Sequence, residues 1–223
     1  KNGISKHVLT NWIKEYNVDG YRMDLSKGFT QTNSGSDAGK WGKKDISRIN
    51  IIKDYHQALK EANPNAVFIL EHFADYDEEV ILSTEGMLPW RNMTSNYGQA
   101  TMGYSSNSNF VDTNGKGGMF TNGWVGFAES HDEERLGYKM IAWGTGDLKT
   151  NESARLKRVP LVMAFVSFIP GPKMLWQFQE MGYDYSIEYG GRTSRKPIPW
   201  TAFNSNQAKQ EAYEASAKII SLR

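Results

Sequence analysis

The spacing of hydrophobic and polar residues predicts an alternation of helices and strands in the first third of the chain. Apolar residues recur at helical spacing over 4–16, and a short apolar strand follows over 18–23. Asp45 is placed to cap a second helix over 46–62, and a strand over 67–70 comes after that helix. Strands that are separated by helices pair in parallel, because parallel neighbours need a connection of a dozen or more residues.

The rest of the chain repeats this order less regularly. Three further strands are predicted over 86–90, 124–127 and 173–177, the first of them weakened by Pro89. Helices are predicted over 152–168, with an interruption at Pro160, and over 207–222. Polar segments rich in Gly, Ser, Thr and Asn predict loops over 30–44, after Asp132 and over 179–200. The segment 92–123 is predicted to be a helix followed by a long surface loop.

The five predicted strands indicate the fold class. A closed parallel α/β barrel needs eight strands and about 250 residues, whereas this chain has 223 residues. An open five-stranded sheet leaves unpaired edges and a half-filled interior, which natural folds avoid. We therefore expect an α/β protein, a single domain over 1–223, that forms part of a (β/α)8 barrel. Its missing strands would be supplied elsewhere or by a second copy.

Composition and charge exclude several classes of function. The net charge is +1 and no basic block occurs, so nucleic acid is not an expected partner. No apolar run approaches the 18 residues of a membrane span. The chain has no cysteine, which excludes disulfides, thiolate catalysis and cysteine-bound zinc, and its four histidines show no metal-ligand spacing. No metal ligand and no cofactor are predicted.

Three acidic residues each follow a predicted strand: Asp24, Glu71 and Asp132. In a parallel barrel the carboxyl ends of the strands converge on one face, so acids far apart in sequence can meet there. Paired carboxylates at such a face are what cleavage of a glycosidic bond requires. Any one of these acids alone is more often a helix N-cap than a catalytic group. The three together favour an enzyme.

Three stretches resemble signature regions of the alpha-amylase family, glycoside hydrolase family thirteen, and occur in the order of that family. They are Gly20-Tyr21-Arg22-Met23-Asp24-Leu25-Ser26-Lys27, Glu71 at a strand end, and Phe127-Ala128-Glu129-Ser130-His131-Asp132. The segment 172–180 is also similar to the family's eighth strand and the turn after it. The resemblance covers the portion from the helix before strand four to the helix after strand eight. The family's first signature region and its C-terminal β domain are not in this sequence.

This resemblance implies a role for each acid. Asp24 would be the nucleophile that forms a covalent glycosyl-enzyme intermediate, and Glu71 would be the general acid and base, with a pKa raised relative to that of Asp24. Arg22 lies on the same strand face as Asp24, by the period of two, and would hold it as a carboxylate. Taken alone, Arg22 is more often part of a structural ion pair.

The remaining implied residues would contact the sugar. Asp132 would grip sugar hydroxyls more strongly as the ring flattens toward an oxocarbenium ion, and His131 would bind the same ring. Lys27 would contact the leaving-group side. Gly28 stands where the family often has His, so the resemblance leaves open both the Lys27 contact and the family's calcium site. Without the resemblance, His131 is more often a buried histidine with hydrogen-bond partners inside the protein, and Lys27 is more often a charged side chain exposed to solvent.

Together these residues predict a retaining glycoside hydrolase that acts on an α-1,4-glucan oligosaccharide or polysaccharide such as starch. Two alternatives remain open at this point: a transglycosylase of the same family, such as a glucan branching enzyme, and a non-catalytic α-glucan-binding protein. A binding protein has no need of a nucleophile, which argues against the latter. The 223 residues alone are expected to be weakly active or inactive. The sequence does not indicate a location, although degradation of starch by the parent protein would favour secretion or the periplasm.

Overall fold

The structure is a computed structural model that describes residues 2–111 and 122–223. It is an α/β fold with a four-stranded sheet in the order β1-β2-β3-β4, and part of the loop predicted over 92–123 lies outside the described residues. The strands are β1 (Gly20–Met23), β2 (Val67–Leu70), β3 (Leu88–Asn92) and β4 (Val125–Phe127). The helices are α1 (Asn2–Tyr16), α2 (Ala38–Trp41), α3 (Ile46–Ala62), α4 (Tyr76–Thr84), α5 (Thr94–Met102), α6 (Leu136–Trp143), α7 (Glu152–Leu156), α8 (Val159–Phe168), α9 (Trp200–Asn204) and α10 (Gln207–Ser221), with short 3-10 turns η1 (Ser26–Phe29), η3 (Gly146–Lys149) and η4 (Gln179–Met181).

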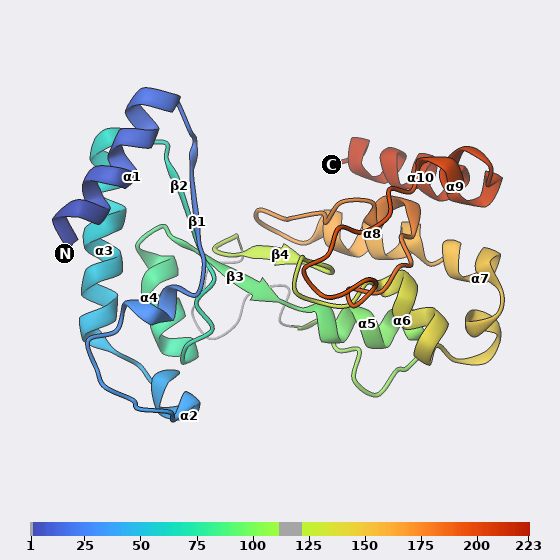
Figure 1. The fold of residues 1–223 in the computed structure, drawn as a ribbon, viewed down its shortest axis with the longest axis horizontal. Helices are drawn as coiled ribbons and strands as arrows, with labels where there is room; N and C mark the ends of the chain where they lie inside the picture. Colours follow the sequence, from blue (N-terminus) through green and yellow to red (C-terminus); the bar gives the residue numbers. More distant parts are fainter. Residues whose placement is uncertain (1, 112–121) are drawn as a thin grey trace. The chain divides into compact units, whose positions relative to one another are not determined.

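The described residues pack as two compact units, which Figure 1 shows as a ribbon. The first unit contains 2–91 and 122–125, and the second contains 92–111 and 126–223. Each unit has its own buried apolar clusters. The single domain over 1–223 stays a prediction.

Parallel pairing of β1 with β2 fixes the geometry of the first unit. The register runs from Gly20 opposite Val67 to Met23 opposite Leu70, so the two strands end level with each other. A side chain at Gly20 would collide with the carbonyl oxygen of Val67, which explains the glycine at the start of β1. Strand β3 continues the parallel order on the other side of β2. The residues that follow β1 and β2 are therefore neighbours at one edge of the sheet.

Helices α1 and α3 pack with this part of the sheet (Figure 1). Their buried residues join those of β2 and α4 in one core: Leu9, Ile13, Ile49, Ile52, Tyr55, Leu59, Phe68, Leu70 and Leu82. Asp45 caps α3 as predicted, accepting hydrogen bonds from the backbone N–H groups of Ser47 and Arg48. An adjacent face of α1 leaves apolar side chains exposed, namely Ile4, Val8, Trp12 and Tyr16.

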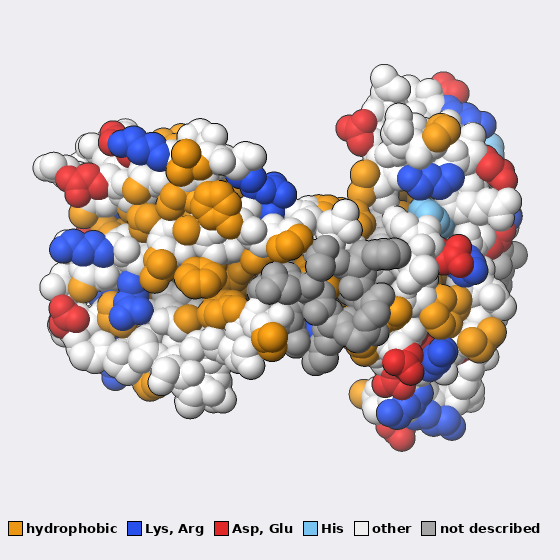
Figure 2. Space-filling view, turned by 180° about the vertical axis from the view of Figure 1, so that it is seen from behind, with side chains coloured by type: hydrophobic (Ala, Val, Ile, Leu, Met, Phe, Trp, Pro, Cys, Tyr) orange, Lys and Arg blue, Asp and Glu red, His pale blue; other side chains and the backbone are white. Residues whose placement is uncertain are grey.

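The second unit is mainly helical. Helix α10 packs against α8, and α5 packs against α6. The break predicted at Pro160 is confirmed, since α7 ends at Leu156 and α8 begins at Val159. Hydrophobic side chains also reach the surface of both units (Figure 2), including Leu161, Phe165 and Phe168 of α8. No helix within the described ranges is both long enough and apolar enough to cross a bilayer.

The prediction of a strand over 173–177 is wrong. Lys173 forms only an isolated parallel bridge with Gly126, framed by hydrogen bonds from Gly126 N to Pro172 O and from Met174 N to Gly126 O, each 3.0 Å long. Strand β4 has three residues and so offers little length to pair with, and Pro172 has no N–H to donate. The described residues therefore contain four strands where the sequence predicted five.

Two predicted irregular segments contain α-helices instead. Asp37 caps α2 within the loop predicted over 30–44, by accepting a hydrogen bond from Lys40 N. Helix α6 occupies the polar stretch after Asp132, whereas α9 begins only at Trp200, the last residue of the loop predicted over 179–200. These helices have at most eight residues, too few to give a clear hydrophobic period in sequence.

Candidate active site

Asp24 and Glu71 directly follow β1 and β2, at the level ends of the two strands. The ladder continues past the strands, because Glu71 N donates to Met23 O at 2.9 Å. The Asp24 side chain is 77% exposed and that of Glu71 is 14% exposed. The first unit thus presents two carboxylates side by side, one open to solvent and one largely covered.

Arg22 joins the two carboxylates. Its Nη1 donates to Asp24 Oδ1 at 2.7 Å, and its Nη2 forms an ion pair with Glu71 Oε1 at 3.3 Å. The guanidinium lies over the ring of Trp90, with its carbon 5.0 Å from the ring centroid. Its Nε and Nη2 are buried without a hydrogen-bond partner, so the charge of the carboxylates and the Trp90 ring are what stabilise these two nitrogens. The predicted contact of Arg22 with Asp24 is confirmed, and Arg22 contacts Glu71 as well.

The segment after β1 wraps around Glu71. Leu25 N donates to Glu71 Oε2 at 2.8 Å, and Ser26 N donates to Glu71 O at 2.8 Å. The backbone of Leu25 is left-handed, with φ 42°. A positive φ is uncommon for a residue other than glycine, asparagine or aspartate. Both the carboxylate and the peptide of Glu71 are thereby fixed by backbone N–H groups.

Lys27 lies in the 3-10 turn η1 that follows. Its ammonium is 4.7 Å from the ring centroid of Trp41, and its carbonyl accepts hydrogen bonds from Trp41 Nε1 and Arg48 Nη1. The Lys27 side chain therefore makes a cation–π contact on α2. Its contact with a sugar stays a prediction.

His131 and Asp132 lie together in the second unit, shortly after β4. His131 Nε2 is 3.1 Å from Asp132 Oδ2, and both side chains are about half exposed. Arg192 approaches from the loop before α9: its Nη2 donates to Asp132 O at 2.8 Å and lies 3.6 Å from Asp132 Oδ1. The structure therefore pairs His131 with Asp132. The meeting of Asp132 with Asp24 and Glu71 stays a prediction.

A cavity of about 460 Å³ opens beside His131 within the second unit. Its walls are aromatic and basic, and include Trp176, Phe178, Tyr183, Tyr185, Arg192 and Arg195. The rings of His131 and Trp176 are 6.0 Å apart. This volume falls in the range of small-molecule sites, and aromatic walls with a few polar groups suit a ligand that carries both apolar faces and hydroxyls.

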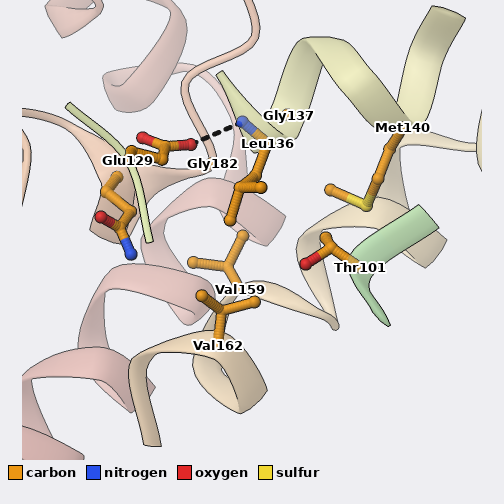
Figure 3. A pocket seen from close by; sticks show the side chains of 9 residues that line it. Thr101, Glu129, Leu136, Gly137, Met140, Val159, Val162 and Gly182 are labelled. Carbon is orange, nitrogen blue, oxygen red and sulfur yellow. Dashed lines mark hydrogen bonds between the residues drawn. The ribbon is translucent and has the colours of Figure 1, made fainter. Parts of the chain in front are cut away.

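A second cavity in this unit is too small for a sugar (Figure 3). Its volume is about 10 Å³, close to the minimum for one water molecule. Glu129 lines it and accepts a hydrogen bond from Leu136 N at 2.6 Å, drawn as the dashed line in Figure 3. Burial raises the pKa of Glu129, and Arg135 forms an ion pair with it at 2.8 Å. Glu129 is thus a buried acid that holds the start of α6, whereas Asp132 is accessible.

Sequence reasoning missed Arg192 and the backbone N–H groups around Glu71. Arg192 is 60 residues from Asp132, in a Gly-rich turn that gives no helical or strand period. Backbone N–H donors have no signature in a single sequence. Among the described residues, no three His, Asp or Glu side chains gather in an arrangement that could hold a metal ion.

The fold resembles those of several solved glucan-processing enzymes. The pullulanase of Anoxybacillus sp. LM18-11 complexed with maltotriose matches with a TM-score of 0.72 at 18% sequence identity, over 99% of this chain and 32% of the pullulanase. The type I pullulanase of Bacillus subtilis str. 168 complexed with maltose matches with a TM-score of 0.71 at 16% identity, over 99% and 32%. An acarbose-soaked debranching enzyme of Nostoc punctiforme matches with a TM-score of 0.63 at 14% identity, over 99% and 43%.

These likenesses concern the fold, because the identities are low. The chain spans about a third of the length of the pullulanases that it matches. A scan against protein-family models finds no match, and a search of curated proteins finds none either.

Proposed function

We propose that this chain is the part of a (β/α)8 barrel that carries the catalytic acids of a retaining glycoside hydrolase acting on α-glucans. The single observation that carries the proposal is the joining of Asp24 and Glu71 through Arg22 at the level ends of β1 and β2. A retaining mechanism needs two carboxyl groups about 5 to 5.5 Å apart, on either side of the scissile bond. Two carboxylates on one guanidinium are compatible with that spacing.

In this mechanism Asp24 attacks the anomeric carbon and forms a covalent glycosyl-enzyme. Glu71 gives its proton to the departing glycosidic oxygen and then takes a proton from the water that releases the sugar. Arg22 keeps Asp24 ionised, which a nucleophilic carboxylate requires. Asp132 and His131 bind hydroxyls of the ring in which charge develops. The low exposure of Glu71 suits a proton donor, and the high exposure of Asp24 suits a nucleophile that a substrate must reach.

The number of strands and the exposed side of α1 support a partial barrel. The described residues supply four parallel strands of the eight that a barrel needs. Ile4, Val8, Trp12 and Tyr16 recur every four residues on α1 and are between 48% and 75% exposed. A stripe of this kind usually packs against another element. We expect the 223 residues alone to turn over substrate weakly or not at all.

Substitution of each acid tests the proposal in the protein that contains this chain. We expect Asp24→Asn and Asp132→Asn to abolish release of nitrophenol from a blocked maltooligosaccharide. Glu71→Gln should lower turnover by about 10²- to 10⁴-fold, the range for loss of a general acid. Asp19→Asn is the matched control, because exposed Asp19 precedes β1 at the opposite end of the strand. Full activity in all three acid variants would overturn the assignment of these acids, whereas an unaltered protein that binds maltooligosaccharide without any turnover would favour a non-catalytic α-glucan-binding protein.

The linkage that is cleaved has two candidates. The resemblance of the sequence motifs favours α-1,4 bonds, and the similar structures, which are pullulanases and a debranching enzyme, favour the bonds at branch points. Reducing ends released from a linear maltooligosaccharide and from pullulan, compared at equal mass, distinguish the two. Longer products from the linear substrate alone would indicate the alternative activity, a transglycosylase.

A further inference from the structure

We propose that Ser26 and His72 are positioning residues for Glu71, at the end of a buried hydrogen-bond chain that begins at an Arg48–Glu78 ion pair. The proposal rests on Glu71 acting as the general acid and base. Ser26 lies two residues after Asp24, and His72 directly follows Glu71. This hydrogen-bond chain therefore links the two segments that present the Asp24 and Glu71 carboxylates.

The hydrogen bonds of the chain are short and buried. His72 Nε2 lies 2.7 Å from Glu78 Oε1, and His72 Nδ1 lies 2.9 Å from Ser26 Oγ. His72 and Ser26 are both 0% exposed. Ser26 Oγ is also 3.1 Å from Glu71 O, the same carbonyl that accepts from Ser26 N. Ser26 therefore contacts the peptide of Glu71 twice.

Arg48 anchors the far end of the chain. Its Nε and Nη2 donate to the two carboxylate oxygens of Glu78 at 2.6 and 2.7 Å, and Asp45 N donates to Glu78 Oε2 at 2.8 Å. A bidentate pair of this kind is strong and fixes orientation. Arg48 also donates from Nη1 to Lys27 O, in the turn that contains Ser26. The ion pair thus holds both α4 and the segment after β1.

The charges indicate which atoms carry the protons. Arg48 balances the negative charge of Glu78, so a neutral His72 leaves this buried group without net charge. The Glu78 carboxylate accepts a hydrogen bond from His72 Nε2–H, which leaves Nδ1 as an acceptor for the Ser26 hydroxyl. The one proton of the Ser26 hydroxyl is then shared between His72 Nδ1 and Glu71 O, which fixes the rotation of the Ser26 side chain.

The serine, histidine and glutamate have the order of a nucleophile, base and orienting acid. Their burial excludes that role, because a substrate cannot reach a hydroxyl on a side chain that is 0% exposed. The hydrogen-bond chain instead fixes the position of the peptide group of Glu71. Leu25 N, one residue before Ser26, donates to the Glu71 carboxylate, so a shift of Ser26 also displaces that contact. A misplacement of about 1 Å can cost about a hundredfold in rate.

Ser26→Ala removes the hydroxyl with little change of volume, and Ser26→Thr restores it. Ser83→Ala is the matched control, because Ser83 is also buried and its hydroxyl donates to Gly123 O elsewhere in the same unit. In the protein that contains this chain, we expect Ser26→Ala to lower kcat by about ten- to hundredfold, with KM changed by less than about threefold. Ser26→Thr should recover most of kcat, and Ser83→Ala should leave kcat unchanged.

A spectroscopic measurement on the protein that contains this chain is independent of turnover. In NMR spectra, the ring nitrogens of His72 should show the Nε2–H tautomer. Ser26→Ala should shift the resonances of His72 Nδ1, the Leu25 amide and the Glu71 carboxyl carbon. If Ser26→Ala does not fold, His72→Gln, which keeps a donor toward Glu78 and lacks the ring acceptor, takes its place with the same expectations for kcat, the Leu25 amide and the Glu71 carboxyl carbon.

Glu71→Gln separates the two proposals. If Glu71→Gln keeps full activity, the proposed function fails, and the shifts at Leu25 and Glu71 alone decide the positioning role. If Glu71→Gln is inactive while Ser26→Ala keeps kcat and leaves the Leu25 and Glu71 resonances in place, the positioning role is overturned and the proposed function stands.

Discussion

Leu25 and Phe73 show how the backbone is strained next to the candidate acids. Each has a positive φ, 42° and 51°, and each lies within two residues of Asp24 or Glu71. Neither residue type adopts this conformation readily, and strain of this kind persists where surrounding contacts enforce it. The N–H of Leu25 is held by Glu71 and the N–H of Phe73 by Glu79. The strained backbone at Leu25 and Phe73 thus occurs where their N–H groups donate hydrogen bonds next to the candidate acids.

Substitution of Leu25 measures this strain. We expect Leu25→Val to lower the free energy of unfolding by about 1–3 kcal/mol, because a β-branched residue is least tolerant of positive φ. Leu25→Gly should cost much less or stabilise the fold, since glycine adopts this conformation readily and the Leu25 side chain is 45% exposed. Urea denaturation followed by circular dichroism gives both values. Equal stability of the Val variant and the wild type would contradict the assignment of strain.

At the residue scale, the sequence predicted the contacts that depend on strand geometry. The period of two placed Arg22 beside Asp24, and the structure shows the hydrogen bond between them. Contacts that come from distant loops or from backbone N–H groups could not be predicted in this way. Arg192 at Asp132 and Leu25 N at Glu71 are examples, because neither has a local pattern.

Helix α4 is the element that holds the segment after β2. Two consecutive acids in its first turn contact two consecutive residues of that segment: Glu78 binds His72, and Glu79 accepts from Phe73 N at 3.0 Å. Burial raises the pKa of Glu79 to about 7, against the lowering effects of Arg91 and the Phe73 N–H. Burial also opposes ionisation of Glu78, but hydrogen bonds from His72 and Arg48 outweigh it and lower the pKa.

The raised pKa of Glu79 makes stability depend on pH. The folded chain binds this proton more tightly than the unfolded chain, whose Glu pKa is near 4.5, so stability is full below that value and falls as pH rises through about 7. We expect Glu79→Gln to match the wild type near pH 4 and to exceed its free energy of unfolding by roughly 3 kcal/mol above pH 8. The amide oxygen of Gln still accepts from Phe73 N.

Urea denaturation at a series of pH values checks this prediction. Glu61→Gln, at an exposed position on α3, is the control and should leave the pH dependence unchanged. A Glu79→Gln variant with the same pH dependence as the wild type would show that folding does not raise the pKa of Glu79.

At the element scale, long helices with caps were predicted well and short elements were not. Asp45 marks the start of α3, and the end of α10 lies within one residue of the prediction. Helix α4 was not predicted, because the buried glutamates of its polar first turn have the sequence pattern of a solvent-exposed segment. The strand expected over 173–177 failed because its partner β4 has only three residues.

At the scale of the whole molecule, the sequence indicated an α/β fold with parallel strands, and the structure confirms this. It gave no sign of two compact units, because no linker or change of composition separates them and their boundaries fall within β3 and β4. The likeness to pullulanases and a debranching enzyme, over about a third of the pullulanase length, agrees with a partial barrel. What the two units do together depends on whether Asp24, Glu71 and Asp132 serve one substrate.

Trapping of the covalent intermediate tests the central claim most directly. A fluorinated α-glucosyl fluoride that forms the glycosyl-enzyme quickly and releases it slowly is incubated with the protein that contains this chain, and peptides are then analysed by mass spectrometry. The account predicts one added fluoroglucosyl group, attached to Asp24, with labelling slowed in Asp132→Asn. Attachment to any other residue, or no label on a protein that hydrolyses α-glucans, would contradict it.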